Sequence, residues 1–146
     1  MTVRITEDTL DPWSYLASYQ SADNAVVAGC FGATAVFVGS MRDFNEGSPV
    51  HSMFLECYPG MAIRYLEELC TVAIERWQLL DALIVHRTGE LLPGEPIVLV
   101  AVWSEHRAEA FEASRYLMEG LKSHAPFWKK EQLDGDSRWV ERKTPA

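Results

Sequence analysis

Three observations predict a single α+β domain. Helical and extended patterns alternate along the chain, with no linker, repeat or low-complexity tract between them. At 146 residues the chain is long enough for one hydrophobic core and too short for two ordinary domains. Hydrophobic residues make up 48% and charged residues 23%, which is typical of globular proteins and argues against extended disorder. We therefore expect one domain over residues 1–146.

The first elements are predicted to be a strand and a helix. The strand covers residues 3–6, and the helix follows Asp11, an N-cap residue type, with Pro12 at its first position. Asp23 and Asn24 are then expected to turn the chain. The residues expected to face inward from this helix are Trp13, Leu16 and Ala17.

A pair of strands is predicted next. Residues 26–41 are small and apolar with glycines interspersed, which favours one long or bent central strand that ends at Arg42. A polar loop covers residues 43–49, and apolar and polar residues then alternate over residues 50–58. This alternation predicts a second strand, whose nearest partner would be the first strand, as a hairpin.

The next segment combines a helix with two strands. Apolar residues recur every three or four positions over residues 61–77, which predicts an amphipathic helix of about four to five turns. Strands are expected at residues 82–87 and 96–103, joined through the Leu-Pro-Gly-Glu turn at residues 92–95. The second of these strands is apolar enough to be central.

The last predicted helix, residues 105–123 with Ser104 as its N-cap, has cationic or titratable side chains at both ends. These side chains are His106, Arg107, Lys122, Lys129 and Lys130. In a chain of net charge −8 such a cluster points to a local anionic ligand. The amide groups and dipole at the helix start, beside His106 and Arg107, already favour an anion.

Helix geometry separates the two ends of this cluster. Arg107, Phe111, Met118 and Lys122 fall on one helix face, but Arg107 and Lys122 are separated by about 22 Å at 1.5 Å per residue. Two arrangements remain open: the ends serve different sites, or a symmetric dimer brings the start of one helix to the end of the other. We favour the dimer.

The segment after the helix is predicted to hold its lysines in place. Pro126, Phe127 and Trp128 end the helical region, and burial of the two aromatic rings would fix Lys129. Neighbouring cations lower a lysine pKa and suit it to proton transfer, and Glu131 could pair with one lysine. Plain structural roles for the same residues stay open, with Lys122 complementing the helix dipole and Met118 packing in the core. The residues alone indicate an anion site and name no reaction.

Several function classes fit the sequence poorly. The acidic charge disfavours nucleic-acid binding, and no run of about 18 apolar residues is present for a membrane span. The polar N-terminus lacks the pattern of a signal peptide, so a cytoplasmic protein is expected. The cysteines have no CxxC or metal-ligand spacing, which predicts neither a metal site nor a disulfide framework. They are Cys30, Cys57 and Cys70.

Five segments, taken together and in this order, form a specific pattern. They are residues 37–42, 55–62, 86–90, 104–111 and 121–131. Over about residues 26–140 this pattern resembles the large, catalytic subunit of molybdopterin synthase. The resemblance implies a single-domain α/β hammerhead-type fold with an antiparallel or mixed sheet and flanking helices. It also implies a homodimeric core with a small ubiquitin-like sulfur-carrier subunit at each end, which makes a heterotetramer.

The implied activity is that of a sulfurtransferase in molybdenum cofactor biosynthesis. Sulfur would pass from the C-terminal thiocarboxylate of the carrier to cyclic pyranopterin monophosphate, forming the dithiolene of molybdopterin. Because the sulfur arrives on a partner, the resemblance implies no cofactor and no metal in this subunit, and no role for the cysteines beyond packing. The anionic substrate agrees with the cation cluster.

The resemblance also implies the site residues. Lys122 and Lys129 would be catalytic, stabilising negative charge and moving protons. Arg42, His106 and Arg107 would hold the substrate phosphate. The remaining substrate-binding positions are Phe37 and Met118 as apolar walls, together with Lys130 and Glu131. Arg142 and Lys143 would add cations near the pocket.

Two other functions are alternatives to this one. An enzyme acting on another phosphorylated small molecule, such as a phosphotransferase, lacks support because the sequence contains no P-loop, carboxylate pair or metal-ligand set. A non-catalytic anion-binding adaptor that only docks the sulfur carrier would have little reason to contain both Lys122 and Lys129.

Overall fold

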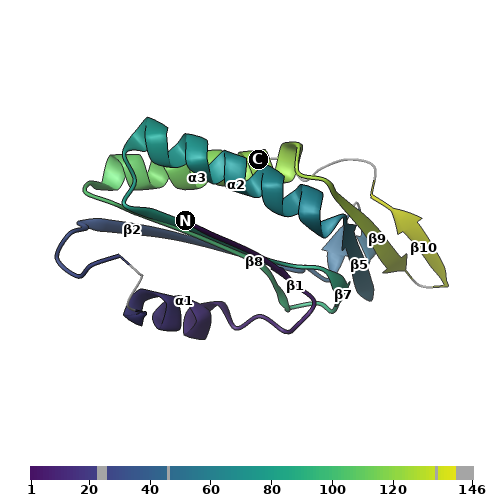
Figure 1. Cartoon of the computed structure of the whole chain (residues 1–146). Helices are drawn as coiled ribbons and strands as arrows, with labels where there is room; N and C mark the ends of the chain where they lie inside the picture. The colour runs from purple at the N-terminus through teal and green to yellow at the C-terminus, as the bar shows by residue number, and fades with distance from the viewer. Residues whose placement is uncertain (23–25, 46, 134, 141–146) are drawn as a thin grey trace.

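A mixed four-stranded sheet forms the centre of the molecule (Figure 1). In the computed structural model, which describes residues 1–22, 26–45, 47–133 and 135–140, its strand order is β1-β6-β8-β2. β1 pairs with β6 in parallel, and the other two pairings are antiparallel. The strands are β1 (Thr2–Thr6), β6 (Asp81–Arg87), β8 (Pro96–Ser104) and β2 (Ala33–Ser40). β6 and β8 are central because apolar residues occupy both of their faces, as the sequence predicted for the second of them.

A second, antiparallel sheet lies at one end of the first, with the order β10-β9-β5-β7. Its strands are β5 (Ser52–Cys57), β7 (Gly89–Leu91), β9 (Phe127–Leu133) and β10 (Asp136–Trp139). A small hairpin of β3 (Phe44–Asn45) and β4 (Ser48–Pro49) connects the two sheets along the chain. The predicted pairing of β5 with β2 is therefore wrong. The register shifts at Gly39/Ser40, β2 ends there, and the chain passes to the second sheet, where β5 pairs with β9 and β7.

Helices cover both faces of the main sheet (Figure 1). α2 (Pro59–Trp77) and α3 (Arg107–Ser123) lie side by side on one face, and α1 (Pro12–Ser21) lies on the other. α2 and α3 approach closely at Gly120, because a Cβ atom there would stand 2.7 Å from the Leu69 side chain. The Tyr65 hydroxyl also donates to the Gly120 carbonyl at 2.9 Å. No helix within the described part of the chain combines the length and apolarity needed to cross a membrane.

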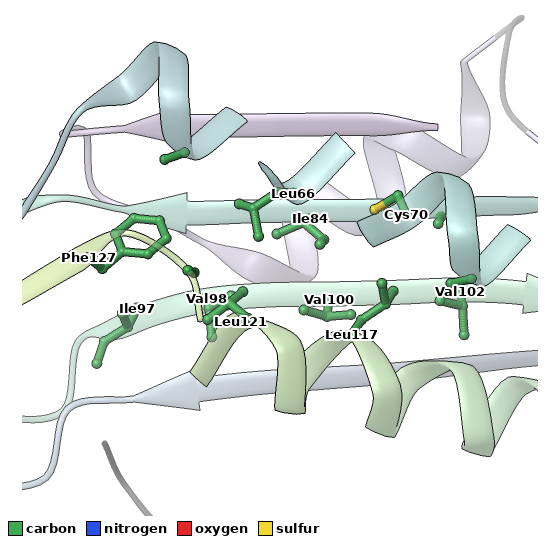
Figure 2. Packing of buried hydrophobic residues seen from close by; sticks show 14 of the residues in the cluster. Leu66, Cys70, Ile84, Ile97, Val98, Val100, Val102, Leu117, Leu121 and Phe127 are labelled. Carbon is green, nitrogen blue, oxygen red and sulfur yellow. The ribbon is translucent and has the colours of Figure 1, made fainter. Parts of the chain in front are cut away.

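The larger core fills the layer between α2, α3 and the sheet. Inward residues of β6 and β8 meet Leu66, Cys70, Leu117 and Leu121 from the two helices (Figure 2). Phe127 closes one end of this layer, where β9 begins. The core is therefore continuous from the main sheet into the second sheet. The sheet residues that Figure 2 labels are Ile84, Ile97, Val98, Val100 and Val102.

α1 begins as predicted but buries a different face. Asp11 is its N-cap, accepting a hydrogen bond from the Ser14 amide at 3.2 Å. Trp13, however, is 63% exposed, and Ala17 is also exposed. Tyr19 takes the inward position, because its ring stacks on Trp103 at 5.6 Å and its hydroxyl donates to Asp81. Leu16, as predicted, also faces inward, because with Tyr15 it packs against the smaller core on this face of the sheet. The buried residues of that core are Leu10, Leu83, Val85, Leu99, Ala101 and Trp103.

Other predicted boundaries also change. The strand predicted over residues 26–41 is only β2, and it lies at the edge of the sheet rather than at its centre. Met61, expected to face inward from α2, is exposed. β7, β9 and β10 were not predicted. The turn predicted at Asp23 and Asn24 lies outside the described residues.

Candidate functional site

The start of α3 presents the side chains of His106 and Arg107 to solvent. His106 is the N-cap residue, and its side chain makes no capping hydrogen bond. Ser104, the predicted N-cap, instead donates from its hydroxyl to the His106 carbonyl and so shapes the turn before the helix. The His106 side chain is 72% exposed, and Arg107 is exposed beside it. Unpaired amide groups of the first turn, the helix dipole and these two side chains all favour an anion at this place.

The end of α3 is built differently, because it leads directly into the second sheet. Lys122 lies in the last turn and is half-buried. After Ser123 the chain turns sharply, with the Phe127 amide donating to the Ala125 carbonyl at 2.8 Å, and enters β9. Lys122 therefore stands where the helix and β9 meet.

The aromatic residues that begin β9 hold the strand in place. Phe127 is 5% exposed, and its ring stacks on His86 with the centroids 4.2 Å apart. Trp128 was also predicted to be buried, but it is 44% exposed and packs edge-on against Tyr58. One ring rather than two therefore anchors β9 in the core, because successive residues of a strand point to opposite faces.

The same alternation separates the two lysines of β9. Lys129 shares the inward face with Phe127, pairs in register with the buried Leu55, and is half-buried. Lys130 lies on the outer face and is exposed, with its Nζ atom 5.6 Å from the centre of the Trp139 ring. Lys129 and Lys130 therefore do not act as one cationic cluster.

Glu131 is buried on the inward face of β9 and pairs across the sheet with Arg138 of β10. Its Oε2 atom accepts from Arg138 Nη2 at 3.1 Å and Nε at 3.2 Å. Sequence reasoning missed Arg138. The signal that would have found it is the Asp-Gly dipeptide at residues 134–135, a hairpin sequence that folds the following residues back onto β9.

Arg42 and the two predicted apolar walls lie along β2 and α3. Arg42 is exposed just after β2, where it lines an open pocket with Met41, Asp43, Pro93 and Gly94. Phe37 is partly exposed on β2, in register with Val100 and so on the sheet face that α3 covers. Met118 is half-buried against the large core. Its position is compatible with core packing and with a wall.

α3 is continuous, so its two ends form two separate groups about 22 Å apart in one chain. We call His106 and Arg107 the helix-start group. The helix-end group comprises Lys122, Lys129 and the ion pair of the buried Glu131 with the partly exposed Arg138. The helix-start group is open to solvent, whereas the helix-end group is partly enclosed by the helix and the second sheet.

Two of the three cysteines, Cys57 and Cys70, are poorly suited to nucleophilic chemistry. Burial raises the pKa of Cys70 to about 12 and also raises the pKa of Cys57, so both stay protonated at neutral pH. Cys30 is exposed on a loop, so the expected packing role is wrong for this residue. Among the described residues, no three His, Cys, Asp or Glu side chains are grouped in a way that could hold a metal ion. Arg142 and Lys143, the predicted additional cations, lie outside the described residues.

Comparisons with known proteins agree on one family. The family model described as "MoaE protein" matches residues 5–124. A molybdopterin synthase catalytic subunit from Ralstonia nicotianae is 46% identical, covering 96% of this chain and 77% of the relative. The solved molybdopterin biosynthesis MoaE protein from Burkholderia ambifaria has a TM-score of 0.79 and 39% identity over 99% of this chain and 92% of its own. A structure of molybdopterin synthase from Staphylococcus aureus has a TM-score of 0.83 and 29% identity, covering 95% and 96% of the two chains.

Proposed function

Because this chain belongs to the MoaE family and is a catalytic subunit of molybdopterin synthase, we propose that the two ends of α3 carry out its sulfur transfer. The sulfur donor is the C-terminal thiocarboxylate of a small ubiquitin-like carrier protein. The acceptor is cyclic pyranopterin monophosphate, which becomes the dithiolene of molybdopterin. The observation that carries this assignment is the partly enclosed pair Lys122 and Lys129, held where α3 meets β9.

The helix-start group binds the phosphate of the pterin. An arginine guanidinium offers a planar fork that matches phosphate oxygens, and hydrogen bonds to charged groups are the strong ones. His106 and the amide groups of the first turn add donors around the same anion. Arg42, exposed beside its own open pocket, supplies a further cation for the substrate.

The helix-end group handles the sulfur. For each of the two sulfurs of the dithiolene, a bond forms between the carrier's sulfur and a pterin carbon while a C–O bond at that carbon breaks and its oxygen leaves. Water then hydrolyses the thioester bond between that sulfur and the carrier's carbonyl carbon, which releases the carrier as a carboxylate and leaves the sulfur on the pterin. Lys122 and Lys129 stabilise the negative charge that develops in these steps and move the protons. The Glu131–Arg138 pair keeps β9 in register with β10, so that Lys129 projects inward. The protein needs no metal, cofactor or cysteine for this chemistry, because the sulfur comes from the partner.

One complete site needs both groups, and they belong to two chains. About 22 Å separates the groups along one helix, which is too far for one small substrate to bridge. In a symmetric dimer, the helix-start group of one chain reaches the helix-end group of the other, and symmetry makes two such sites. With one carrier docked at each site, the assembly is a heterotetramer.

A reconstituted reaction tests the proposal. The protein is mixed with thiocarboxylated carrier and cyclic pyranopterin monophosphate, and the product is measured through its oxidised fluorescent derivative. We expect dithiolene product that depends on both added components. Carrier binding without any product would instead mean a non-catalytic adaptor and would reject the proposed function.

A further inference from the structure

Arg87, the last residue of β6, is a buried charged side chain with no part in the sulfur-transfer scheme above. It is 5% exposed, although it carries a permanent positive charge. It lies at the opposite end of β6 from Asp81, next to His86, whose ring stacks on Phe127 at the start of β9. Its contacts join three separate segments of the chain.

The Arg87 guanidinium fixes the turn between β7 and β8. Its Nη1 atom donates to Glu95 Oε2 at 3.0 Å, and its Nη2 atom donates to the Glu90 carbonyl at 3.3 Å and the Glu7 carbonyl at 3.5 Å. The same Glu95 oxygen accepts from the Leu92 amide at 2.9 Å. That amide, followed by Arg87, lowers the pKa of Glu95, so its carboxylate stays charged at neutral pH.

The turn that Arg87 fixes in turn holds Met41, the residue that precedes Arg42. The Met41 amide donates to the Glu95 carbonyl at 2.9 Å, and the Gly94 amide donates to the Met41 carbonyl at 2.8 Å. Met41 is buried, and Arg42 follows it into the pocket that Pro93 and Gly94 also line. A chain of hydrogen bonds therefore runs from Arg87 through Glu95 and the turn to the backbone of Met41, the residue directly before Arg42.

Stability alone is a weak explanation for Arg87. The Arg87 side chain is 6% exposed and the Glu95 side chain is 31% exposed. Desolvating a charge such as that of Arg87 costs energy that the Coulomb attraction to its partner often fails to recover, so the pair is poor evidence for stabilisation. Within the described part of the chain, the buried Arg87 Nε atom has no hydrogen-bond partner, which adds to that cost. What the side chain does achieve is geometric, because it links the ends of β1 and β6 to the turn beside Arg42.

We propose that Arg87 is a positioning residue that sets the place of Arg42 and thereby the affinity for the phosphorylated substrate. The proposal rests on the proposed function, in which Arg42 contacts the anionic pterin. Lysine cannot replace Arg87, because a single ammonium group cannot donate to Glu95, Glu90 and Glu7 together as the planar guanidinium does. Glu95, which accepts from Arg87, is the second residue in this positioning role.

Steady-state kinetics with the reconstituted carrier and cyclic pyranopterin monophosphate test this role. We expect Arg87→Lys to raise KM for the pterin about tenfold, with a smaller change in kcat, because a displaced binding group weakens the complex. Glu95→Gln keeps the shape of the side chain and should raise KM less. Arg76→Lys is the matched control, since Arg76 is exposed on α2 and packs over Trp77; its KM should equal that of the wild type.

A double-mutant cycle separates positioning from plain structural damage. If Arg87 acts through Arg42, adding Arg87→Lys to Arg42→Ala should leave KM where Arg42→Ala alone has set it. Effects that multiply, or a normal KM in both Arg87→Lys and Glu95→Gln, would overturn the proposal. Thermal unfolding shows whether the Arg87→Lys variant folds. If it does not, the cycle is measured with Glu95→Gln in place of Arg87→Lys. Wild type that forms no product rejects the proposed function instead, so the two failures are distinguishable.

Discussion

The two ends of α3 carry similar charges but hold them in different ways. At the start, His106 and Arg107 project from a first turn with no side-chain cap, and both are exposed. At the end, Lys122 and Lys129 are half-buried where the helix meets β9, and the buried Glu131 of the same strand pairs with Arg138. An exposed cation attracts and holds an anion, whereas a partly enclosed one can stabilise charge at a fixed point during a reaction. This difference supports the proposal that the first end binds the substrate and the second end carries out the chemistry.

The largest expected effect is at the enclosed end. Lys122→Ala and Lys129→Ala should each lower kcat by about 100-fold or more, because a preorganised charge is lost from the reacting atoms. Lys130→Ala, on the opposite face of the same strand, should cost much less. Dithiolene formation measures the rates, and thermal unfolding checks that each variant is folded. Near-normal rates in both Lys122→Ala and Lys129→Ala would contradict the difference between the two ends of α3.

The exposed end should respond in binding rather than in rate. Arg107→Ala should raise KM for the pterin about tenfold and change kcat little, since a charge-assisted hydrogen bond to phosphate is lost. Added salt should raise the wild-type KM as well, because exposed charges are screened. A loss confined to kcat, with KM unchanged, would place Arg107 in the chemistry instead.

A smaller effect should follow from loosening the enclosed end without touching a lysine. Arg138→Gln removes the charged partner of the buried Glu131 and should cost about 2 kcal/mol of unfolding free energy. Because β9 is then held less firmly, kcat should fall several-fold with KM nearly constant. Chemical denaturation and the same kinetic assay measure the two effects. Unchanged stability would show that the pair does not brace β9.

The sequence predicted best where a local pattern decided the structure. The recurrence of apolar residues found α2, and the apolar run at residues 96–103 found β8 as a central strand. Asp11 and Pro12 marked the start of α1. Each of these depends on residues close together in the chain, which is where propensity and periodicity carry information.

The errors arose where distant residues decide the structure. Trp13 is exposed because the inward position of α1 belongs to Tyr19, whose partners Trp103 and Asp81 lie far along the chain. β9 was missed because its Lys-Lys-Glu run resembles a loop, and only pairing with β5 and β10 makes it a strand. Lys129 and Lys130 point to opposite faces because β9 is a strand, so their directions cannot be predicted without that strand.

The same limit applies to the candidate site. Sequence reasoning named both ends of α3 and their separation, and the continuous helix agrees with that estimate. It missed Arg138 and the hydrogen bonds that link Arg87 to the segment before Arg42, because both depend on turns that bring distant residues together. The catalytic and binding roles of the individual residues stay predictions until the variants are measured.

The central claim, that each site combines the helix start of one chain with the helix end of another, has a direct test. A His106→Ala/Arg107→Ala chain and a Lys122→Ala chain are coexpressed with different affinity tags, and the mixed dimer is isolated through both tags. Pairing of the intact Lys122 of the first chain with the intact helix start of the second restores one of two sites. We predict about half of wild-type turnover per dimer at a pterin concentration below the wild-type KM, although each parent dimer is nearly inactive. Turnover no higher than that of the parents would contradict the shared site.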